Sequence, residues 1–580
     1  MRKSLSQKTF WFLLSLATPL YFGLISLQYA FSRDYLIQDD ARLHIVWLQQ
    51  FVDPDLFPGD FIAEYYQTIQ AVGFQTLYWI MAQLGIAPLL LAKLLPTVLA
   101  LIATIYLFHL TLRLLPAPAC GFLATLLLNQ NIWLKDDLIS ATPRAFIYPL
   151  FTAFLYYLVR QSSIPLLIAL TLTSLFYPQV ALVELGVLTL RLWQKQLITS
   201  DQRRDYKLWL AAVGLVSITI LPFQQQITSQ FGEVLTAAQM QQMPEFGING
   251  RREYFGVDPI SFAFRGASGL RLPLFPPILW VSLGLPILSR TKLLQTQLLR
   301  TKLLQTQLLR THLSALKAIP SEVKLLLQVG LASVTLFLLA HLLFPKLYLP
   351  SRYTFYSFRV IMPIAAGIVL WIGLAAGWQW WRRQVHLRFW QKLTVGLVGL
   401  FAVVVVVTPA IPALFLNCHG WIEGSQPQIY QFLAKQPKNT LVASLTPETD
   451  NLPAFTQRSV LVSRELALAY HPTFYDVMQQ RIADLLEAQY SPDVTILQTV
   501  IQKYGIDFWL LDRQFTNPGY LAQQDWLRYS SLQNTVEATI RRLEQGTIPA
   551  MSQTLAACTA IAENNLIVLQ ASCIGAVQSE

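Results

Sequence analysis

The sequence predicts a polytopic α-helical membrane protein of about 11 transmembrane helices, followed by a C-terminal soluble α/β domain. Hydrophobic residues make up 54% of the 580 residues and charged residues 13%, which is about half the charged share of an ordinary soluble chain. Long apolar runs recur up to residue 415, and beyond about Asn417 they shorten and mix with polar residues. We therefore divide the chain into a membrane module, residues 1–415, and a soluble domain, residues 416–580.

The first apolar run, Phe10–Phe31, follows a basic N-terminus and has no small-residue cleavage site, so it predicts an uncleaved anchor. A polar loop, residues 32–87, comes next. Its apolar stretch Ala71–Leu84 is too short to span and ends at Gly85 and Pro88, which predicts a helix at the membrane interface.

Ten further runs predict spans. Pro178 divides one long apolar stretch, where we expect a tight turn between two short helices; a single kinked helix is the alternative. The expected spans are Pro88–Leu112, Cys120–Leu134, Pro143–Val159, Ile164–Tyr177, Gln179–Leu192, Leu208–Phe223, Pro276–Leu288, Leu325–Phe344, Val360–Trp378 and Leu393–Phe415.

Charged residues divide between the two sides of these spans. Loops on the side of the N-terminus are rich in Lys and Arg, whereas the opposite loops hold nearly all the carboxylates of the membrane module. Cytoplasmic loops carry the Lys and Arg excess, so we predict a cytoplasmic N-terminus and, after an odd number of spans, an extracytoplasmic C-terminal domain. The same loops explain the net charge of +11, which therefore does not indicate nucleic-acid binding.

The C-terminal part has the pattern of an α/β domain. We expect strands at Leu441–Leu445, Val460–Ser463 and Phe508–Asp512, and helices at Pro472–Gln489 and Pro492–Tyr504. In an extracytoplasmic domain, Cys558 and Cys573 are candidates for a disulfide that would staple a terminal strand pair. Neither the Cys nor the His spacing indicates zinc.

One segment is duplicated: Thr291–Arg300 recurs without change at Thr301–Arg310. It is basic, rich in apolar residues and free of Pro and Gly, so it predicts an amphipathic helix on the cytoplasmic face. Two copies do not make a solenoid, and we assign the repeat no catalytic role.

The candidate site begins at the acidic pair Asp39 and Asp40, which follows the first span together with Arg42 and His44. A carboxylate pair there can act as a general base or hold a divalent cation. The alternative is a solvated loop, since charged loop residues are usually only surface.

Further charged groups share the predicted extracytoplasmic side. A second acidic pair, Asp136 and Asp137, is followed by Arg144, whose position just inside a span is costly unless it has a partner. Arginine forks match phosphate oxygens, and aromatic rings suit a lipid boundary or a sugar face. These aromatic and basic clusters comprise Gly247–Gly256 with Arg265 and Arg271, and Phe344–Arg359 with Arg352, Tyr353 and Arg359. Taken singly, Arg352 or Arg359 can be explained as no more than an anchor of a helix end at the interface.

With these residues the chain resembles the GT-C superfamily, the C-type integral membrane glycosyltransferases that use polyprenyl-phosphate sugars. The matching features are the acidic loop after the first span, its interfacial helices, the many spans and the soluble C-terminal domain. The chain is most similar to bacterial members with Ala-Thr-Pro-Arg-Ala-Phe, here Ala141–Phe146, and Tyr-Leu-Pro-Ser-Arg-Tyr, here Tyr348–Tyr353.

The resemblance implies an inverting sugar transfer in a bacterial inner membrane, from a polyprenyl-phosphate donor to a glycan, lipid or protein acceptor. Asp40 or Asp39 would activate the acceptor, and Asp136 or Asp137 would help to position the acceptor or a metal. The family has metal-dependent and metal-independent members, so Mg²⁺ or Mn²⁺, held by Asp39, Asp40 and Asp137, stays open. The implied phosphate- and substrate-binding residues are Arg144, Arg352, Arg359, His44 and Tyr353. The Trp-Trp-Asp signature of oligosaccharyltransferases is absent from residues 416–580, which argues against protein N-glycosylation.

Two other functions remain open. Intramembrane charges and Pro-broken spans are also typical of transporters, although the spans show no inverted repeat and the polar residues gather in one-sided loops. A non-catalytic membrane scaffold is the third possibility.

Overall fold

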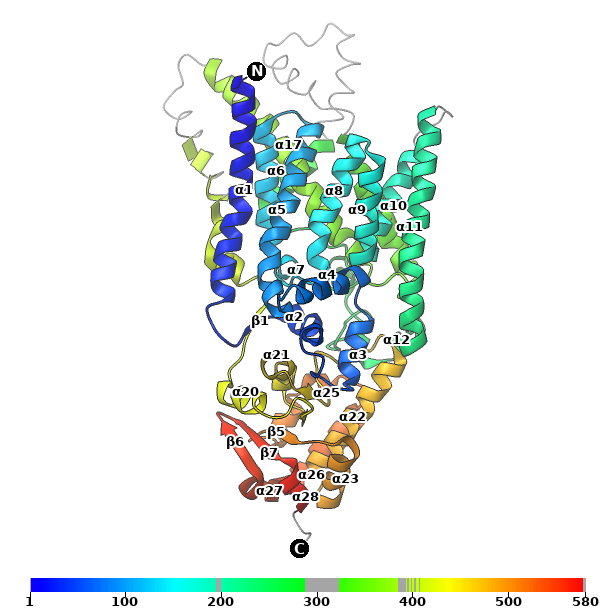
Figure 1. Ribbon diagram of the computed structural model, residues 1–580, viewed down its shortest axis with the longest axis vertical. Helices are drawn as coiled ribbons and strands as arrows, with labels where there is room; N and C mark the ends of the chain where they lie inside the picture. Colours follow the sequence, from blue (N-terminus) through cyan, green and yellow to red (C-terminus); the bar gives the residue numbers. More distant parts are fainter. Residues whose placement is uncertain are drawn as a thin grey trace.

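The computed structural model describes residues 2–193, 200–286, 323–383 and 407–576, with some positions between 393 and 405. Its long helices lie side by side at one end of an elongated molecule and the sheet lies at the other, so the two termini are far apart (Figure 1). The repeat Thr291–Arg310 lies outside the described residues, and the predicted span Leu393–Phe415 is described only in part.

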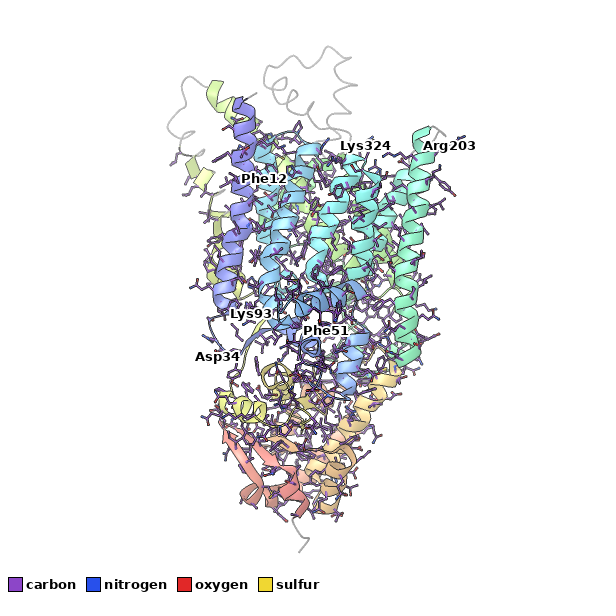
Figure 2. The ribbon with its side chains drawn as sticks, in the orientation of Figure 1. Phe12, Asp34, Phe51, Lys93, Arg203 and Lys324 are labelled. Carbon is purple, nitrogen blue, oxygen red and sulfur yellow. A yellow bond between two sulfur atoms is a disulfide. The ribbon has the colours of Figure 1, made fainter. Side chains whose placement is uncertain are left out.

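Among the residues that the structure describes, five helices are long and apolar enough to cross a membrane, which makes the chain a membrane protein as predicted. They are α1 (Arg2–Ala30), α5 (Pro88–Leu114), α11 (Ser200–Phe231), α16 (Lys324–Leu342) and α17 (Ser351–Arg383). Arg203 and Lys324 lie at the end of this bundle where the N-terminus lies, and Asp34 lies toward the opposite end (Figure 2).

Shorter helices occupy several of the other predicted spans. Length and composition therefore support five spans among the described residues, where the sequence pattern predicted eleven. The turn at Pro178 is the predicted tight one, because one helix ends at Phe176 and the next begins at Pro178. These shorter helices are α6 (Pro118–Trp133), α8 (Ile147–Arg160), α9 (Ser163–Phe176), α10 (Pro178–Trp193) and the 3₁₀ helix η4 (Pro277–Leu283).

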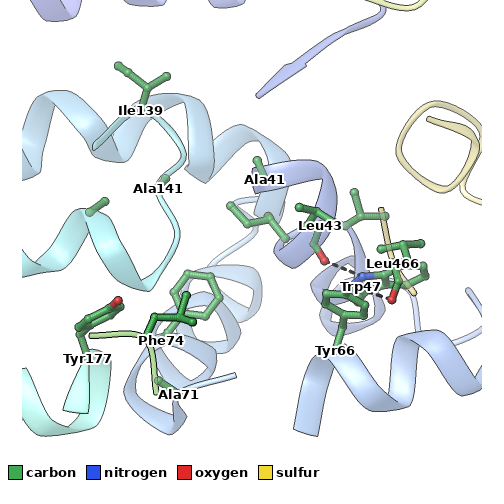
Figure 3. Packing of buried hydrophobic residues seen from close by; sticks show 14 of the residues in the cluster. Ala41, Leu43, Trp47, Tyr66, Ala71, Phe74, Ile139, Ala141, Tyr177 and Leu466 are labelled. Carbon is green, nitrogen blue, oxygen red and sulfur yellow. Dashed lines mark hydrogen bonds between the residues drawn. The ribbon is translucent and has the colours of Figure 1, made fainter. Parts of the chain in front are cut away.

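The first loop folds into short helices between the bundle and the C-terminal region. They are α2 (Asp39–His44), η1 (Val46–Phe51), α3 (Phe61–Thr68) and α4 (Val72–Gln83). Helix α4 occupies the stretch expected at the interface and lies across the bundle (Figure 1). Figure 3 shows how the loop is anchored: the buried indole of Trp47 donates to the Leu43 carbonyl at 2.9 Å, and the Tyr66 hydroxyl donates to the Leu466 carbonyl at 3.2 Å.

The C-terminal region contains a five-stranded sheet in the order β4-β3-β5-β7-β6. The first three strands are parallel, and the segments that connect them contain the helices that such crossovers need, whereas the β5–β7–β6 part is antiparallel. Cys558 and Cys573 form the disulfide expected beside the terminal hairpin. The elements are β3 (Leu441–Ala443), β4 (Ser459–Val460), β5 (Phe508–Asp512), β6 (Thr559–Glu563), β7 (Leu566–Gln570), α22 (Pro472–Tyr490) and α23 (Val494–Tyr504).

A second, two-stranded sheet joins the first loop to the start of the C-terminal region. Strand β1 (Leu36–Gln38) pairs in antiparallel fashion with β2 (Trp421–Glu423), which opens the C-terminal region. The backbone N–H of Asp39 donates to the Gly420 carbonyl at 2.9 Å, and the Gln38 side chain donates to the His419 carbonyl at 3.1 Å. The start of α2 is therefore held by residues almost 400 positions away.

Candidate active site

Two short helices each begin with an Asp-Asp pair. Asp39 and Asp40 open α2, and Asp136 and Asp137 open α7 (Asp136–Ile139). Carboxylates in the first turn are favourable because the N-terminal end of a helix carries positive partial charge. Consecutive residues point about 100° apart around a helix of 3.6 residues per turn, so the two members of each pair face different surroundings.

Arg144 joins one acidic pair to the other. Its guanidinium is ion-paired with Asp40, lies 3.1 Å from an oxygen of Asp137 and lies 3.5 Å from an oxygen of Asp136. It belongs to the 3₁₀ helix η2 (Pro143–Phe146). The backbone at Ala141, with φ +51°, turns the chain between α7 and η2, so that this side chain returns over the carboxylates.

Arg359 of α17 extends the arrangement. Its Nη1 donates to the second oxygen of Asp137 at 2.8 Å and to the Tyr148 hydroxyl at 3.1 Å. Its guanidinium lies 4.0 Å from the centre of the Phe355 ring. Asp40, Arg144, Asp137 and Arg359 therefore form a continuous ion-pair chain built from four separate elements.

Two more arginines border this ion-pair chain. Arg352 donates from Nη1 to the Tyr356 hydroxyl at 3.2 Å. The guanidinium of Arg271 lies 4.7 Å from the centre of the ring of Phe355, a residue of α17. The Nε–H groups of Arg352 and Arg359 are buried and have no hydrogen-bond partner among the described residues. Unused guanidinium donors are suited to an anionic oxygen ligand such as a phosphate.

Asp39 and Asp136 are the outward members of their pairs. Asp39 accepts a hydrogen bond from Arg42 at 2.6 Å, and Arg42 also donates to Asn451 of the C-terminal region at 2.7 Å. A Cβ atom added at Gly420 would lie 3.8 Å from the Cβ of Asp39 and 3.7 Å from that of Asp136. The two half-buried carboxylates therefore flank a position where the chain has no side chain. Burial, followed by the charge of Asp137, raises the pKa of Asp136.

Two of the predicted substrate residues point to other roles. The imidazole of His44 packs against Tyr66, and burial, helped by Arg252, lowers its pKa to about 4. A neutral imidazole does not supply a positive charge to a phosphate at pH 7. Tyr353 is buried, and its hydroxyl donates to the Leu347 carbonyl at 2.8 Å, so this hydroxyl is already used inside the protein.

The expected metal set of Asp39, Asp40 and Asp137 does not fit a divalent cation. Arg144 holds Asp40 and Asp137, and its positive charge would repel a cation, whereas Asp39 turns toward Arg42. Within the described part of the chain, no group of three or more His, Cys, Asp and Glu side chains could hold a metal ion.

Sequence reasoning did not place in the site several residues that the fold brings to it. Tyr148 stands four positions after Arg144, a helical spacing that could have indicated it. Arg271 lies in a cluster that the sequence singled out, but its position beside Phe355 depends on the tertiary structure. Asn451 and Gly420 had no local signal, because both come from the distant C-terminal region.

The structure is similar to solved structures of two kinds of protein. An oligosaccharyltransferase from Archaeoglobus fulgidus, tethered with an acceptor peptide containing the NVT sequon, is 12% identical over 90% of this chain and 72% of its own, with a TM-score of 0.48. ArnT from Cupriavidus metallidurans bound to undecaprenyl phosphate is 14% identical over 98% of this chain and 100% of its own, with a TM-score of 0.47.

No protein-family model and no curated protein matches the sequence. The chain is similar in structure to an oligosaccharyltransferase and to ArnT.

Proposed function

We propose that the chain is a membrane glycosyltransferase that moves a sugar from a polyprenyl-phosphate donor to an acceptor. The observation that carries this proposal is the ion-pair chain from Asp40 through Arg144 and Asp137 to Arg359, with unused arginine donors beside it. It combines a carboxylate for the acceptor with guanidinium groups for the phosphate, and it lies where the first loop meets a long apolar helix.

The proposed orientation follows from the charges. Arg203 and Lys324 lie at the end of the bundle where the N-terminus lies (Figure 2), and basic residues gather on the cytoplasmic side of membrane proteins. We accordingly propose a bacterial inner-membrane protein with a cytoplasmic N-terminus. The site and residues 416–580 are then extracytoplasmic.

The donor phosphate would bind Arg352 and Arg359, with Arg271 beside them. Arg352 and Arg359 keep buried Nε–H donors without partners in the described structure, and both belong to the first turns of α17. A prenyl chain can then lie along the apolar bundle while its phosphate stays at the membrane boundary. The same guanidinium groups would stabilise the negative charge that grows on the leaving phosphate.

Asp40 would serve the acceptor. A donor phosphate close to Arg144 competes with Asp40 for its guanidinium, which frees a carboxylate oxygen to accept the proton of an acceptor hydroxyl or amide. The acceptor atom then bonds to the anomeric carbon, the bond from that carbon to the phosphate oxygen breaks, and polyprenyl phosphate leaves. Direct displacement inverts the anomeric configuration. No step passes through a metal ion.

The test compares lipid-linked sugars and glycoconjugates in membranes from cells with the wild type, a deletion, Asp40→Asn and Asp34→Asn at matched expression. Asp34 is an exposed carboxylate of the same loop and serves as the control. We expect a glycoconjugate to vanish, and a polyprenyl-phosphate sugar to accumulate, in the deletion and in Asp40→Asn alone. Full complementation by Asp40→Asn would refute the assignment.

A multi-pass transporter is the second candidate, favoured by Glu184 of α10. Its carboxyl is fully buried in the helical bundle, where Oε1 accepts from Thr173 at 3.0 Å and Oε2 has no partner in the described structure. Buried ionisable groups of this kind often mark a translocation path. In that case Glu184→Gln would fail to complement the deletion in the same cells, whereas Asp40→Asn would complement it.

A further inference from the structure

A cleft lies where the long loop between α11 and η4 meets the C-terminal region. Its volume, open solvent included, is about 440 Å³. Glu245 and Arg251 line it from the loop. The opposite wall comes from the C-terminal region and includes Arg464, Tyr475, Trp526 and Tyr529.

Glu245 is the most deeply placed charge in this cleft, with 4% of its surface exposed. One carboxylate oxygen accepts three hydrogen bonds, from the Tyr475 hydroxyl at 2.7 Å and from the backbone N–H and hydroxyl of Ser531 at 2.7 and 2.8 Å. The other oxygen is buried and accepts none within the described structure. The first oxygen holds the loop to the C-terminal region, and the second is left for a ligand.

Two donors stand in the same cleft. The Nε–H of Arg251 and the indole N–H of Trp526 are buried, and neither has a hydrogen-bond partner among the described residues. Arg251 is held in place through another nitrogen by its ion pair with Glu465. A buried donor or acceptor without a partner costs free energy, so a ligand that satisfies all three groups would gain accordingly.

A ligand for these groups must both donate and accept hydrogen bonds within a small space. A hydroxyl group does both at one oxygen. At the free oxygen of Glu245 a phosphate or carboxylate would be repelled, although Arg251 and Arg464 line the same cleft. A peptide group carries its donor and acceptor on opposite sides, which needs more room. We infer that this cleft binds hydroxyl groups of a saccharide, with its ring at the mouth beside Trp526 and Tyr529.

The saccharide would be part of the acceptor, an inference that rests on the proposed sugar transfer. The wall of the cleft leads toward the active site: Glu465, the partner of Arg251, precedes Leu466, whose carbonyl accepts from Tyr66. Tyr66 in turn packs against His44 at the end of α2, the helix that begins with Asp39 and Asp40. An acceptor held in the cleft could therefore extend its reacting end toward Asp40.

The test uses the full chain, purified in detergent, on arrays of neutral, amino and acidic oligosaccharides and of peptides, followed by calorimetric titration with the best saccharide. Glu245→Gln replaces the carboxylate, which only accepts hydrogen bonds, with an amide. Trp526→Phe removes the indole N–H but keeps an aromatic ring. We expect each change to weaken saccharide binding by roughly tenfold. Glu233→Gln, an exposed carboxylate that begins the same loop, should bind as the wild type does.

Asp40→Asn separates the two proposals, because it should abolish transfer and leave saccharide binding unchanged. Saccharide binding that depends on Glu245 and Trp526, without transfer by the wild type, would support the cleft and refute the proposed function. Transfer without saccharide binding would refute the cleft alone. Peptide binding that depends on the same two residues, or saccharide binding unaffected by Trp526→Phe, would also overturn the assignment.

Discussion

The two Asp-Asp pairs have the same sequence and the same place at the start of a short helix, yet their members have opposite surroundings. The side chains of Asp40 and Asp137 are 21% and 1% exposed and both meet Arg144. Those of Asp39 and Asp136 are 43% and 39% exposed and flank Gly420. Each pair thus has one member inside the ion-pair chain and one at its edge.

The two carboxylates inside the ion-pair chain, Asp137 and Asp40, also differ from each other. We assign a structural role to the first and a chemical role to the second. Asp137 has both oxygens bound to arginines and almost no contact with solvent, so it holds α7, η2 and α17 together. Asp40 shares only one of these arginines and keeps some exposure, which leaves it able to meet a substrate. An acidic pair is therefore not a single functional unit, and substitutions should affect its two members unequally.

The largest effect is expected from Asp137→Ala. Removing it leaves Arg144 and Arg359 without their shared partner, and breaking a buried ion pair by removing one side costs about 3–5 kcal/mol. Thermal unfolding of the purified chain in detergent would measure the loss. The matched variant Asp136→Ala, at the exposed position, should cost within about 1 kcal/mol. Equal losses would remove the distinction between the members.

The next effect concerns Asp40 against Asp39. If Asp40 takes the acceptor proton, Asp40→Asn should lower the transfer rate by about 10²–10⁴-fold, the usual contribution of a general base, with the unfolding temperature nearly unchanged. Asp39→Asn should lower the rate by less than roughly tenfold on the same scale. The assay is release of polyprenyl phosphate from a polyprenyl-phosphate sugar. A larger loss with Asp39→Asn would exchange their roles.

A smaller effect is expected at Gly420, whose φ is +67°. Gly420→Ala should destabilise the chain by about 1–2 kcal/mol, the cost of a left-handed backbone for a residue with a Cβ, and should slow transfer because the new methyl group enters between Asp39 and Asp136. Gly546→Ala is the control, since its φ is +86° and no atom lies within 4 Å of the added Cβ. It should cost similar stability and leave transfer unchanged.

The smallest effect is a pH dependence at Asp136. Because the pKa of this carboxyl is raised in the folded chain, the folded state keeps a proton that the unfolded state has lost. Stability from this group therefore falls as pH rises from about 4 through the raised pKa. Asp136→Asn lacks that loss, so its unfolding temperature should rise relative to wild type as pH increases from about 4. A constant difference would contradict the raised pKa.

Local pattern alone was sufficient for much of the architecture. Strand β5 has the predicted limits Phe508–Asp512, the turn at Pro178 is where a residue without an N–H would interrupt a helix, and the short apolar stretch before Gly85 forms a separate helix. The predicted helix ends were less accurate where polar residues continue a helix. Helix α11 extends to Phe231, eight residues beyond the predicted end at Phe223.

The candidate site divides in the same way. The sequence by itself determined which residues carry charge beside the membrane, because isolated carboxylates and arginines stand out against apolar runs. Only the tertiary structure decided which of them meet. Asp137 and Arg359 are 222 positions apart, and the pairing of Asp40 with Arg144 depends on how α2 is held by β1, β2 and Gly420. Contacts between distant segments are set by packing and by the cost of burying an unpaired charge. The local periodicity of a sequence predicts neither of these effects.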